Sequence, residues 1–453
     1  MRRKVTNCEA SGTCAQVSWH LWGQYSPYFP VKSEIDAGIP DGCAVTFAQV
    51  LARHGARSPT LHKSEAYNET IHRIKSAVSK YGKGYEFIRN YDYTLGADNL
   101  VPFGRMQMET AGSAFYGRYR DLARTASPFV RASGQERVIE SAVAWTKAFL
   151  ETQGADPDGQ HAKEGNKGDS DPASSILVIP ETEGSNNTLN HGLCLAFETG
   201  DYSHNGLDAQ AVWAAVFVPP IVKRLNRKLP GANITTEEAI YLMDLCPFNV
   251  VANPKTPSGF CNLFTVDEWR GYDYYQSLGK YYGFSSGNPL GPSQGVGFVN
   301  ELLARLTDRP VDDHTSSNTT LDASPDTFPL GRGVYADFSH DNSMSSIFGA
   351  LGLYNATKPL PKGAPRSPQQ TGGYSAAWTV PFAGRMYVEK MRCGADAGAD
   401  KSGQELVRIL INDRVVPLQN CGADELGRCT LDKFVESMAF ARGGGRWGEC
   451  FQS

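Results

Sequence analysis

Short apolar stretches that end in polar, glycine-containing sequence recur along the chain and predict buried β-strands. The first covers residues 44–52 (AVTFAQVLA) and stops at Arg-His-Gly. A second covers residues 129–132 (FVRA) and is followed by Ser-Gly-Gln-Glu. Further strands are expected at residues 176–180, 333–338, 386–390 and 406–411.

Helical spacing follows the second strand. Ser133 to Glu136 matches a capping box, and it precedes apolar residues spaced as on one helix face: Val138, Ala142, Trp145 and Phe149. A strand, a polar turn and a helix N-terminus together favour an anion site, which we place around Arg131.

The segments 61–126 and 193–265 are richer in helical periodicity, and no repeat is visible. We therefore predict an α/β sheet domain that carries a smaller, mostly helical insertion. The expected division is an N-terminal arm at 1–37, a catalytic α/β domain at 38–60, 127–192 and 266–453, and a helical domain at 61–126 and 193–265 that covers the pocket.

Composition excludes several classes of protein. Apolar residues make up 41% of the 453 residues and charged residues 20%, as in a folded globular protein. A net charge of -4 offers no general attraction to nucleic acid or an anionic membrane. The longest apolar run, residues 211–218, is too short to span a membrane. Residues 153–175 are polar and predict a mobile surface loop.

Ten cysteines without a C-x-x-C pair predict five disulfides formed in an oxidising compartment. Short spacing favours Cys8 with Cys14, Cys246 with Cys261, and Cys421 with Cys429. Secretion also agrees with the glycosylation sequons at Asn68, Asn186, Asn233, Asn318 and Asn355. The chain begins with basic residues but shows no apolar signal-peptide region, which indicates that a leader was removed or that the start is incomplete.

The strongest chemical motif is RHGARSP at residues 53–59. Arg53 and Arg57 can donate charge-assisted hydrogen bonds to phosphoryl oxygens, and Gly55 lets the backbone approach closely. His54 is then free to attack phosphorus and form a covalent intermediate. The alternative is an ordinary loop histidine beside surface ion pairs.

A second motif, His340-Asp341-Asn342, also follows a predicted strand. Asp341 is suited to donate a proton to the leaving oxygen, and His340 to bind the phosphate. Taken alone, these residues are more typical of a turn, and Arg131 alone is more typical of a structural ion pair.

The sequence resembles the histidine acid phosphatases, and among them the secreted fungal phytases. The resemblance covers nearly the whole chain, and its motifs include HLWGQYSPYFPV (20–31), VTFAQVLARHGARSPT (45–60), FVRASGQERVIESA (129–142), YLMDLC (241–246), NPLGPSQGVGF (288–298) and YADFSHDN (335–342).

This resemblance implies a mixed sheet flanked by helices, a nucleophile at His54 and a proton donor at Asp341. It implies that phosphate is bound by Arg53, Arg57, Arg131 and His340, without a metal or other cofactor. It further implies the disulfides Cys43–Cys393 and Cys194–Cys450, and a substrate rim formed by Lys83, Arg89, Asp244 and Lys280.

We therefore expect a secreted monomer that hydrolyses phytate (myo-inositol hexakisphosphate) and other phosphomonoesters and binds neither nucleic acid nor membrane. The rival hypotheses are a broad acid phosphatase with the same catalytic residues, a non-catalytic anion-binding relative and a phosphoglycerate mutase-like transferase. The last two fit less well, because His54 and Asp341 are both present and the cysteines and sequons are unlike those of a cytosolic mutase.

Overall fold

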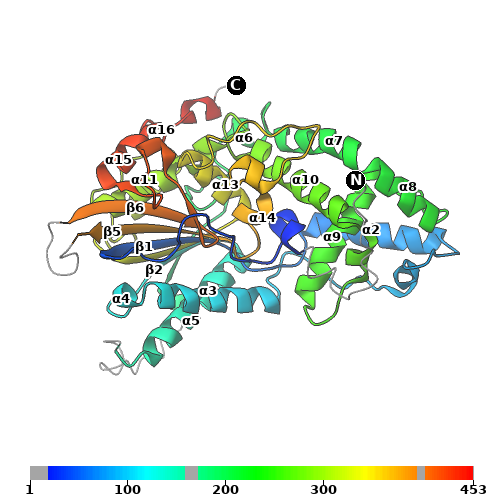
Figure 1. Ribbon diagram of the computed structural model, residues 1–453, viewed down its shortest axis with the longest axis horizontal. Coiled ribbons are helices and arrows are strands. Elements are labelled where there is room, and N and C mark those ends of the chain that lie inside the picture. The colour runs from blue at the N-terminus through cyan, green and yellow to red at the C-terminus, as the bar shows by residue number, and fades with distance from the viewer. Residues whose placement is uncertain (1–18, 159–171, 395–402, 452–453) are drawn as a thin grey trace.

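The computed structural model describes residues 19–158, 172–394 and 403–451. Its centre is a mixed sheet, confirming the expected fold class (Figure 1). The strand order is β3-β2-β4-β1-β5-β6-β7, with β8 paired to β6. The strands are β1 (Cys43–Arg53), β2 (Phe129–Ser133), β3 (Ile176–Ile179), β4 (Val334–Ser339), β5 (Arg385–Cys393), β6 (Gln404–Ile411), β7 (Arg414–Val416) and β8 (Cys429–Thr430).

The direction of the strands changes at β5. Strands β3, β2, β4 and β1 run parallel, whereas β5, β6 and β7 continue the sheet antiparallel. Each predicted strand is present, with bounds that differ by a few residues from those expected. The carboxyl ends of β1 and β4 are neighbours, because Arg53 pairs with Ser339.

Helices cover both faces of the sheet (Figure 1). On one face α3 (Pro102–Arg118) and α5 (Glu136–Ala155) pack their apolar sides against the strands. The other face is covered chiefly by α11 (Val296–Thr307), α13 (Asp341–Ala350) and α15 (Leu431–Ser437). The short helices α4 (Arg120–Ala123), α12 (Thr319–Asp322), α14 (Ala376–Thr379) and α16 (Ala439–Arg442) lie in the connections.

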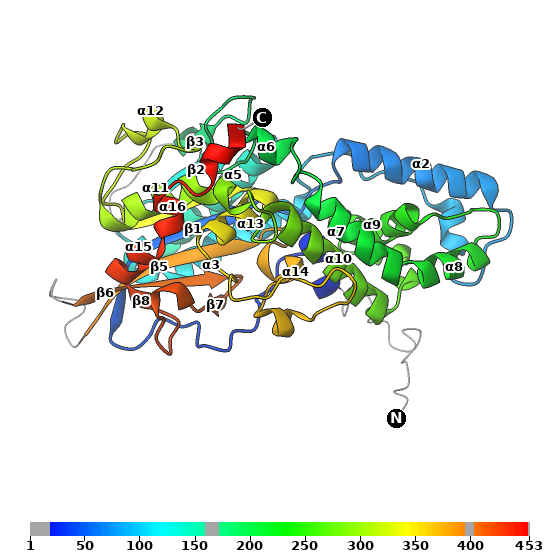
Figure 2. The ribbon, with the colours of Figure 1, turned by 90° about the horizontal axis from the view of Figure 1, so that it is seen from above.

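A second apolar core lies beside the sheet and is built mainly from helices (Figure 2). These are α2 (Leu61–Ala77), α8 (Pro219–Lys228), α9 (Thr236–Ala252), the start of α10 (Val266–Phe284) and the end of α7 (Asn205–Phe217). The short helix α6 (Leu195–Glu198) belongs to a separate small cluster with Cys194 and Cys450. Helices α9 and α10 begin at capping boxes, since Thr235 and Thr265 each exchange hydrogen bonds with a glutamate three residues on.

The helical part is not bounded as the sequence suggested. Helix α3, expected within it, packs over the sheet, whereas Trp269 and Tyr272 of α10 belong to the helical core. Trp22, from the expected arm, is fully buried in the same core. No helix among the described residues is long and apolar enough to cross a membrane.

The capping box expected at residues 133–136 is wrong. Ser133 is the last residue of β2, and its hydroxyl donates to Glu181 instead of capping a helix. Gln135 precedes α5 without a side-chain cap, so the helix itself is confirmed but its start signal is not.

Four predicted disulfides are present: Cys43–Cys393, Cys194–Cys450, Cys246–Cys261 and Cys421–Cys429. Cys43–Cys393 joins directly paired residues of β1 and β5. Cys8 and Cys14 lie outside the described residues, as does most of the loop expected at 153–175.

Candidate active site

The two predicted catalytic residues meet where two parallel strands end. The backbone N–H of His54, just after β1, donates to the carbonyl of Ser339, the last residue of β4, at 3.2 Å. Asp341 opens α13 immediately afterwards, and the rings of His54 and His340 have centroids 5.7 Å apart. Ligands of α/β sheets collect at such carboxyl edges.

His54 is buried and held in one tautomer. Its Nδ1 lies 2.8 Å from the carbonyl oxygen of Gly55. Because a carbonyl can only accept, Nδ1 carries the hydrogen and Nε2 keeps its lone pair. Burial, and then the nearby Arg53 and Arg137, lower the pKa of His54 well below its usual value. The lowered pKa favours the neutral imidazole, whose Nε2 lone pair is then available as a nucleophile.

Arg53 is completely buried beside this histidine. Its Nη1 donates to the carbonyl of Gln24 and, at 2.8 Å, to that of Val380, and its guanidinium lies 4.5 Å from the centre of the Phe382 ring. Within the described part of the chain, its Nε and Nη2 have no hydrogen-bond acceptor. The fixed guanidinium thus directs its remaining donors into the site, where Nη2 lies 3.4 Å from Oδ2 of Asp341.

Two more arginines add to this positive charge. Arg57 donates to its neighbour's carbonyl at 2.8 Å, and Arg137 lies 3.3 Å from Asp98. The Nε of each is buried without an acceptor among the described residues. Burial first, and then repulsion from Arg57, lower the pKa of Arg137 to about 10. A bound oxyanion would relieve this repulsion and satisfy the free donors.

The prediction missed Arg137. It occupies the first turn of α5, a helix whose N-terminus favours anions. The anion site expected at the β2–α5 turn therefore has an arginine beside it, but this arginine is Arg137 and not Arg131.

Arg131 is the corresponding correction. Its Nε lies 2.8 Å from Asp337, and its Nη2 lies 2.6 Å from Glu301. The second carboxylate oxygen of Asp337 pairs with Arg305 at 2.7 Å. All four side chains are buried, and Arg131 lies two residues before the end of β2. Its charge is already compensated in the core, so Arg131 is not a phosphate ligand.

Asp341 lies between two cations. Lys280 is 2.8 Å and Arg53 is 3.4 Å from its Oδ2. Burial alone would raise the pKa of Asp341, but Arg53 and Lys280 outweigh it and hold this pKa well below its usual value. Lys280 also donates to Asn342 at 2.5 Å.

His340 is held by a residue that the sequence did not suggest. Its Nε2 donates to Glu181 at 2.8 Å, and the hydroxyl of Ser133 donates to the same oxygen at 2.5 Å. Only Nδ1 of His340 therefore remains to face a ligand. Glu181 follows β3 by two residues, at the same sheet edge, and this position could have been inferred from the strand.

A cavity of about 430 Å³ adjoins this cluster through Lys280. Asp244 and Lys280 line it, as does Lys63, which was not predicted. Asp244 is buried rather than exposed and accepts hydrogen bonds from Tyr67 and Tyr272. Lys63 lies 3.7 Å from its carboxylate.

Lys83 and Arg89 do not line this cavity. Both are exposed, and the guanidinium of Arg89 stacks on Tyr81 at 5.0 Å. The structure therefore separates these two rim candidates from Asp244 and Lys280. Among the described residues, no group of three or more His, Cys, Asp or Glu is placed to hold a metal ion.

Comparison with known proteins gives concordant matches. Residues 44–412 match the family described as histidine phosphatase superfamily (branch 2). The chain is 51% identical over 438 residues to Phytase A of Aspergillus oryzae, which covers 95% of this chain and 90% of the relative. It is 48% identical over 443 residues to Phytase A of Aspergillus fumigatus, covering 97% and 92%.

A solved structure, the phytase from D. castellii, superposes with a TM-score of 0.74 at 20% identity, covering 100% of this chain and 93% of that one. At so low an identity the likeness concerns the fold alone.

Proposed function

The chain belongs to the histidine phosphatase superfamily (branch 2), and on this premise we propose that it is a phytase that removes phosphate from myo-inositol hexakisphosphate. The relatives named Phytase A support the substrate class. The observation that carries the chemistry is the buried His54, whose Nδ1 contacts the Gly55 carbonyl and leaves Nε2 free, with Arg53, Arg57 and Arg137 close to it.

In the proposed first step, Nε2 of His54 attacks phosphorus while the bond to the inositol oxygen breaks. The three guanidinium groups bind the equatorial oxygens. When its ring carries hydrogen on both nitrogens, His340 adds a fourth donor through Nδ1. The carbonyl of Gly55 stabilises the hydrogen on Nδ1 as the ring becomes positively charged. Water then attacks the phosphohistidine and releases inorganic phosphate.

Asp341 donates the proton to the leaving oxygen. In the structure its carboxylate is stabilised by Arg53 and Lys280, so the free enzyme favours the ionised form. A bound phosphate shares those two cations and adds negative charge nearby, and both effects raise the pKa of Asp341. Substrate binding thus makes Asp341 a competent acid, and the resulting carboxylate can activate the water in the second step.

Phytate carries several phosphates, and the adjoining cavity offers Lys63 and Lys280 to those that do not react. The second candidate is a broad acid phosphatase with the same catalytic residues. The absence of Lys83 and Arg89 from the cavity lining favours this second candidate, because fewer cations are then available to bind the other phosphates of phytate. Comparing kcat/KM for phytate and for p-nitrophenyl phosphate across the acidic range distinguishes the two.

Lys63→Met sharpens this test. We expect it to lower kcat/KM for phytate about tenfold, the equivalent of one charge-assisted hydrogen bond, and to leave p-nitrophenyl phosphate unchanged. Lys83→Met is the matched control, and we expect no change with either substrate. A wild-type enzyme without preference for phytate, or equal losses on both substrates in Lys63→Met, would support the broad acid phosphatase.

We also propose that the enzyme is secreted and acts as a monomer on small phosphomonoesters, without nucleic acid or membrane. The four disulfides of the described residues support an oxidising compartment. Size-exclusion chromatography with light scattering tests the monomer, and a dimer would overturn that part.

A further inference from the structure

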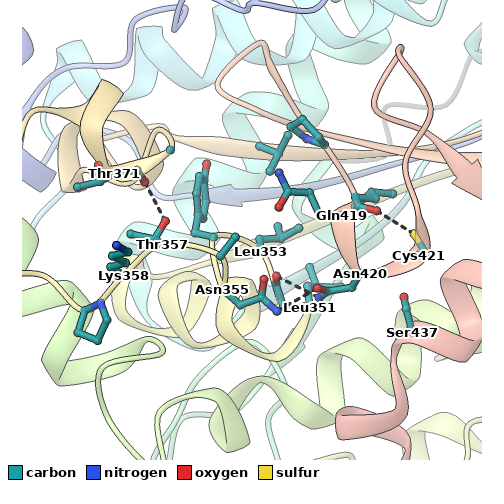
Figure 3. A pocket seen from close by; sticks show the side chains of 18 of the residues that line it. Leu351, Leu353, Asn355, Thr357, Lys358, Thr371, Gln419, Asn420, Cys421 and Ser437 are labelled. Carbon is teal, nitrogen blue, oxygen red and sulfur yellow. Dashed lines mark hydrogen bonds between the residues drawn. The ribbon is translucent and has the colours of Figure 1, made fainter.

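The structure contains another cavity, of about 570 Å³, that none of the catalytic residues lines. Its volume lies within the range of about 300–1,000 Å³ typical of ligand sites. The wall is formed by residues 351–361, which follow α13, by residues between 366 and 372, by residues 416–421 from the end of β7 onward, and by the end of α15 (Figure 3). One of its residues is Asn355, an asparagine of the sequon Asn-Ala-Thr.

The lining combines an apolar surface with amide and hydroxyl groups, and it also includes two cations, Lys358 and Arg366. Leu353, Phe434 and Met438 are buried beneath it. Amides and hydroxyls come from Asn355, Gln370, Gln419, Asn420 and Ser437. None of the described residues that line it is Asp or Glu. The apolar floor and the amides suit a saccharide, whose ring faces are apolar and whose edges are hydroxyls and amides, and the two cations can donate hydrogen bonds to its oxygens.

The backbone is shaped to place Asn355 at this wall. Gly352 has φ +68°, and a Cβ there would lie 2.3 Å from Nδ2 of Asn420. Tyr354 adopts φ +62°, which is costly for an aromatic residue. Nδ2 of Asn355 donates to Oδ1 of Asn420 at 3.1 Å (Figure 3). A sugar bonded to that nitrogen replaces one of its two hydrogens, so the other still donates to Asn420.

We propose that the N-linked glycan of Asn355 folds back into this cavity, with its first N-acetylglucosamine rings held by Gln419 and Asn420. Asn355 is the only one of the five sequon asparagines that lines it. The tether makes the effective concentration of the glycan high, so weak contacts suffice. The proposal rests on secretion, because attachment requires a glycosylating pathway.

The test uses the protein expressed in a glycosylating yeast. An endoglycosidase that cuts between the first two N-acetylglucosamines is applied to the folded protein, and cleavage at each site is followed by glycopeptide mass spectrometry. The reference is Asn233, which is exposed and does not line the cavity. We expect cleavage at Asn355 to be about tenfold slower than at Asn233, the equivalent of one hydrogen bond, and the two to be equal after denaturation.

Two variants separate binding from simple crowding. Gln419→Ala removes an exposed wall side chain and should speed cleavage at Asn355 alone. Gln369→Ala is the control, an exposed glutamine outside the lining, and should change nothing. Equal native rates at Asn355 and Asn233, a slow rate that Gln419→Ala leaves unchanged, or an unoccupied Asn355 would each overturn the proposal.

An unoccupied Asn355 with glycan at Asn233 would leave secretion standing, whereas no glycan at either would count against both. Saturable binding of a free saccharide to the Asn355→Gln protein, together with equal cleavage rates, would assign the cavity to an external carbohydrate instead.

Discussion

Two groups of buried arginines lie in the same sheet domain, and they differ in what balances their charge. In the core, Arg131 and Arg305 face Asp337 and Glu301, so two cations meet two carboxylates. At the sheet edge, the cations Arg53, Arg57, Arg137 and Lys280 outnumber the carboxylates that pair with them among the described residues, which are Asp341 and Asp98. Burial of an arginine therefore does not identify a ligand site. An incomplete balance of charge does.

His54→Ala should have the largest effect on the edge group. Removing the atom that becomes phosphorylated is expected to lower kcat for phytate about 10⁴- to 10⁶-fold. The fold should remain, because the imidazole is not part of the apolar cores. Phosphate release and thermal unfolding measure the two effects. Turnover near that of the wild type would contradict the nucleophile.

Asp341→Asn should cost about 10²- to 10⁴-fold with phytate, whose leaving alkoxide needs a proton. The cost should be much smaller with p-nitrophenyl phosphate, whose leaving group is stable as an anion. The ratio of the two losses is the measurement. Equal losses would remove the assignment of Asp341 as proton donor.

The comparison of the two groups is tested most directly by Arg137→Ala and Arg131→Ala. Arg137→Ala is expected to lower kcat/KM about 10²- to 10³-fold and to leave the free energy of unfolding unchanged or slightly higher. Arg131→Ala should lower that free energy by about 3–5 kcal/mol, since it leaves Asp337 with one buried arginine and Glu301 without this partner. Urea unfolding and steady-state kinetics separate the two outcomes. The comparison fails if Arg131→Ala keeps its stability but loses turnover.

The smallest effect concerns pH and the stability of the edge group. The pKa of His54 is lowered in the folded protein, so below about pH 6.5 the unfolded chain binds a proton there that the folded chain does not. The free energy of unfolding should therefore decrease as the pH is lowered below about 6.5. The decrease per pH unit should be larger in the wild type than in His54→Ala, by up to about 1.4 kcal/mol. Urea unfolding at several pH values measures this difference. As a control, replacing the exposed His62 should leave the pH dependence of the free energy of unfolding as it is in the wild type.

Much of this architecture could be predicted from sequence, because a buried strand is recognisable from a short apolar stretch bounded by polar residues. Each predicted strand of the sheet is present, and His54 and Asp341 lie where the ends of β1 and β4 bring them together. The cysteine spacings and the family resemblance together predicted the four disulfides that the described residues contain.

The choice between arginines could not be made in this way. Arg53 is the last residue of its strand, but Arg131 lies two residues before the end of β2 and points at Glu301. Local sequence does not reveal that Glu301 and Asp337 supply the opposing charges from 170 and 206 positions away. The exposure of Lys83 and Arg89, and the hydrogen bond from His340 to Glu181, depend on the same tertiary arrangement.

The position of β4 in the sheet determines when during folding the active site can form. This strand separates β1 from β2, so the loop with His54 and the helix with Arg137 become neighbours only after residues 334–339 have entered between them. Pairings over so long a stretch of chain fold slowly. During synthesis on the ribosome, the ring of guanidinium groups therefore closes late. Reactivity toward phosphate should appear together with the finished sheet rather than before it.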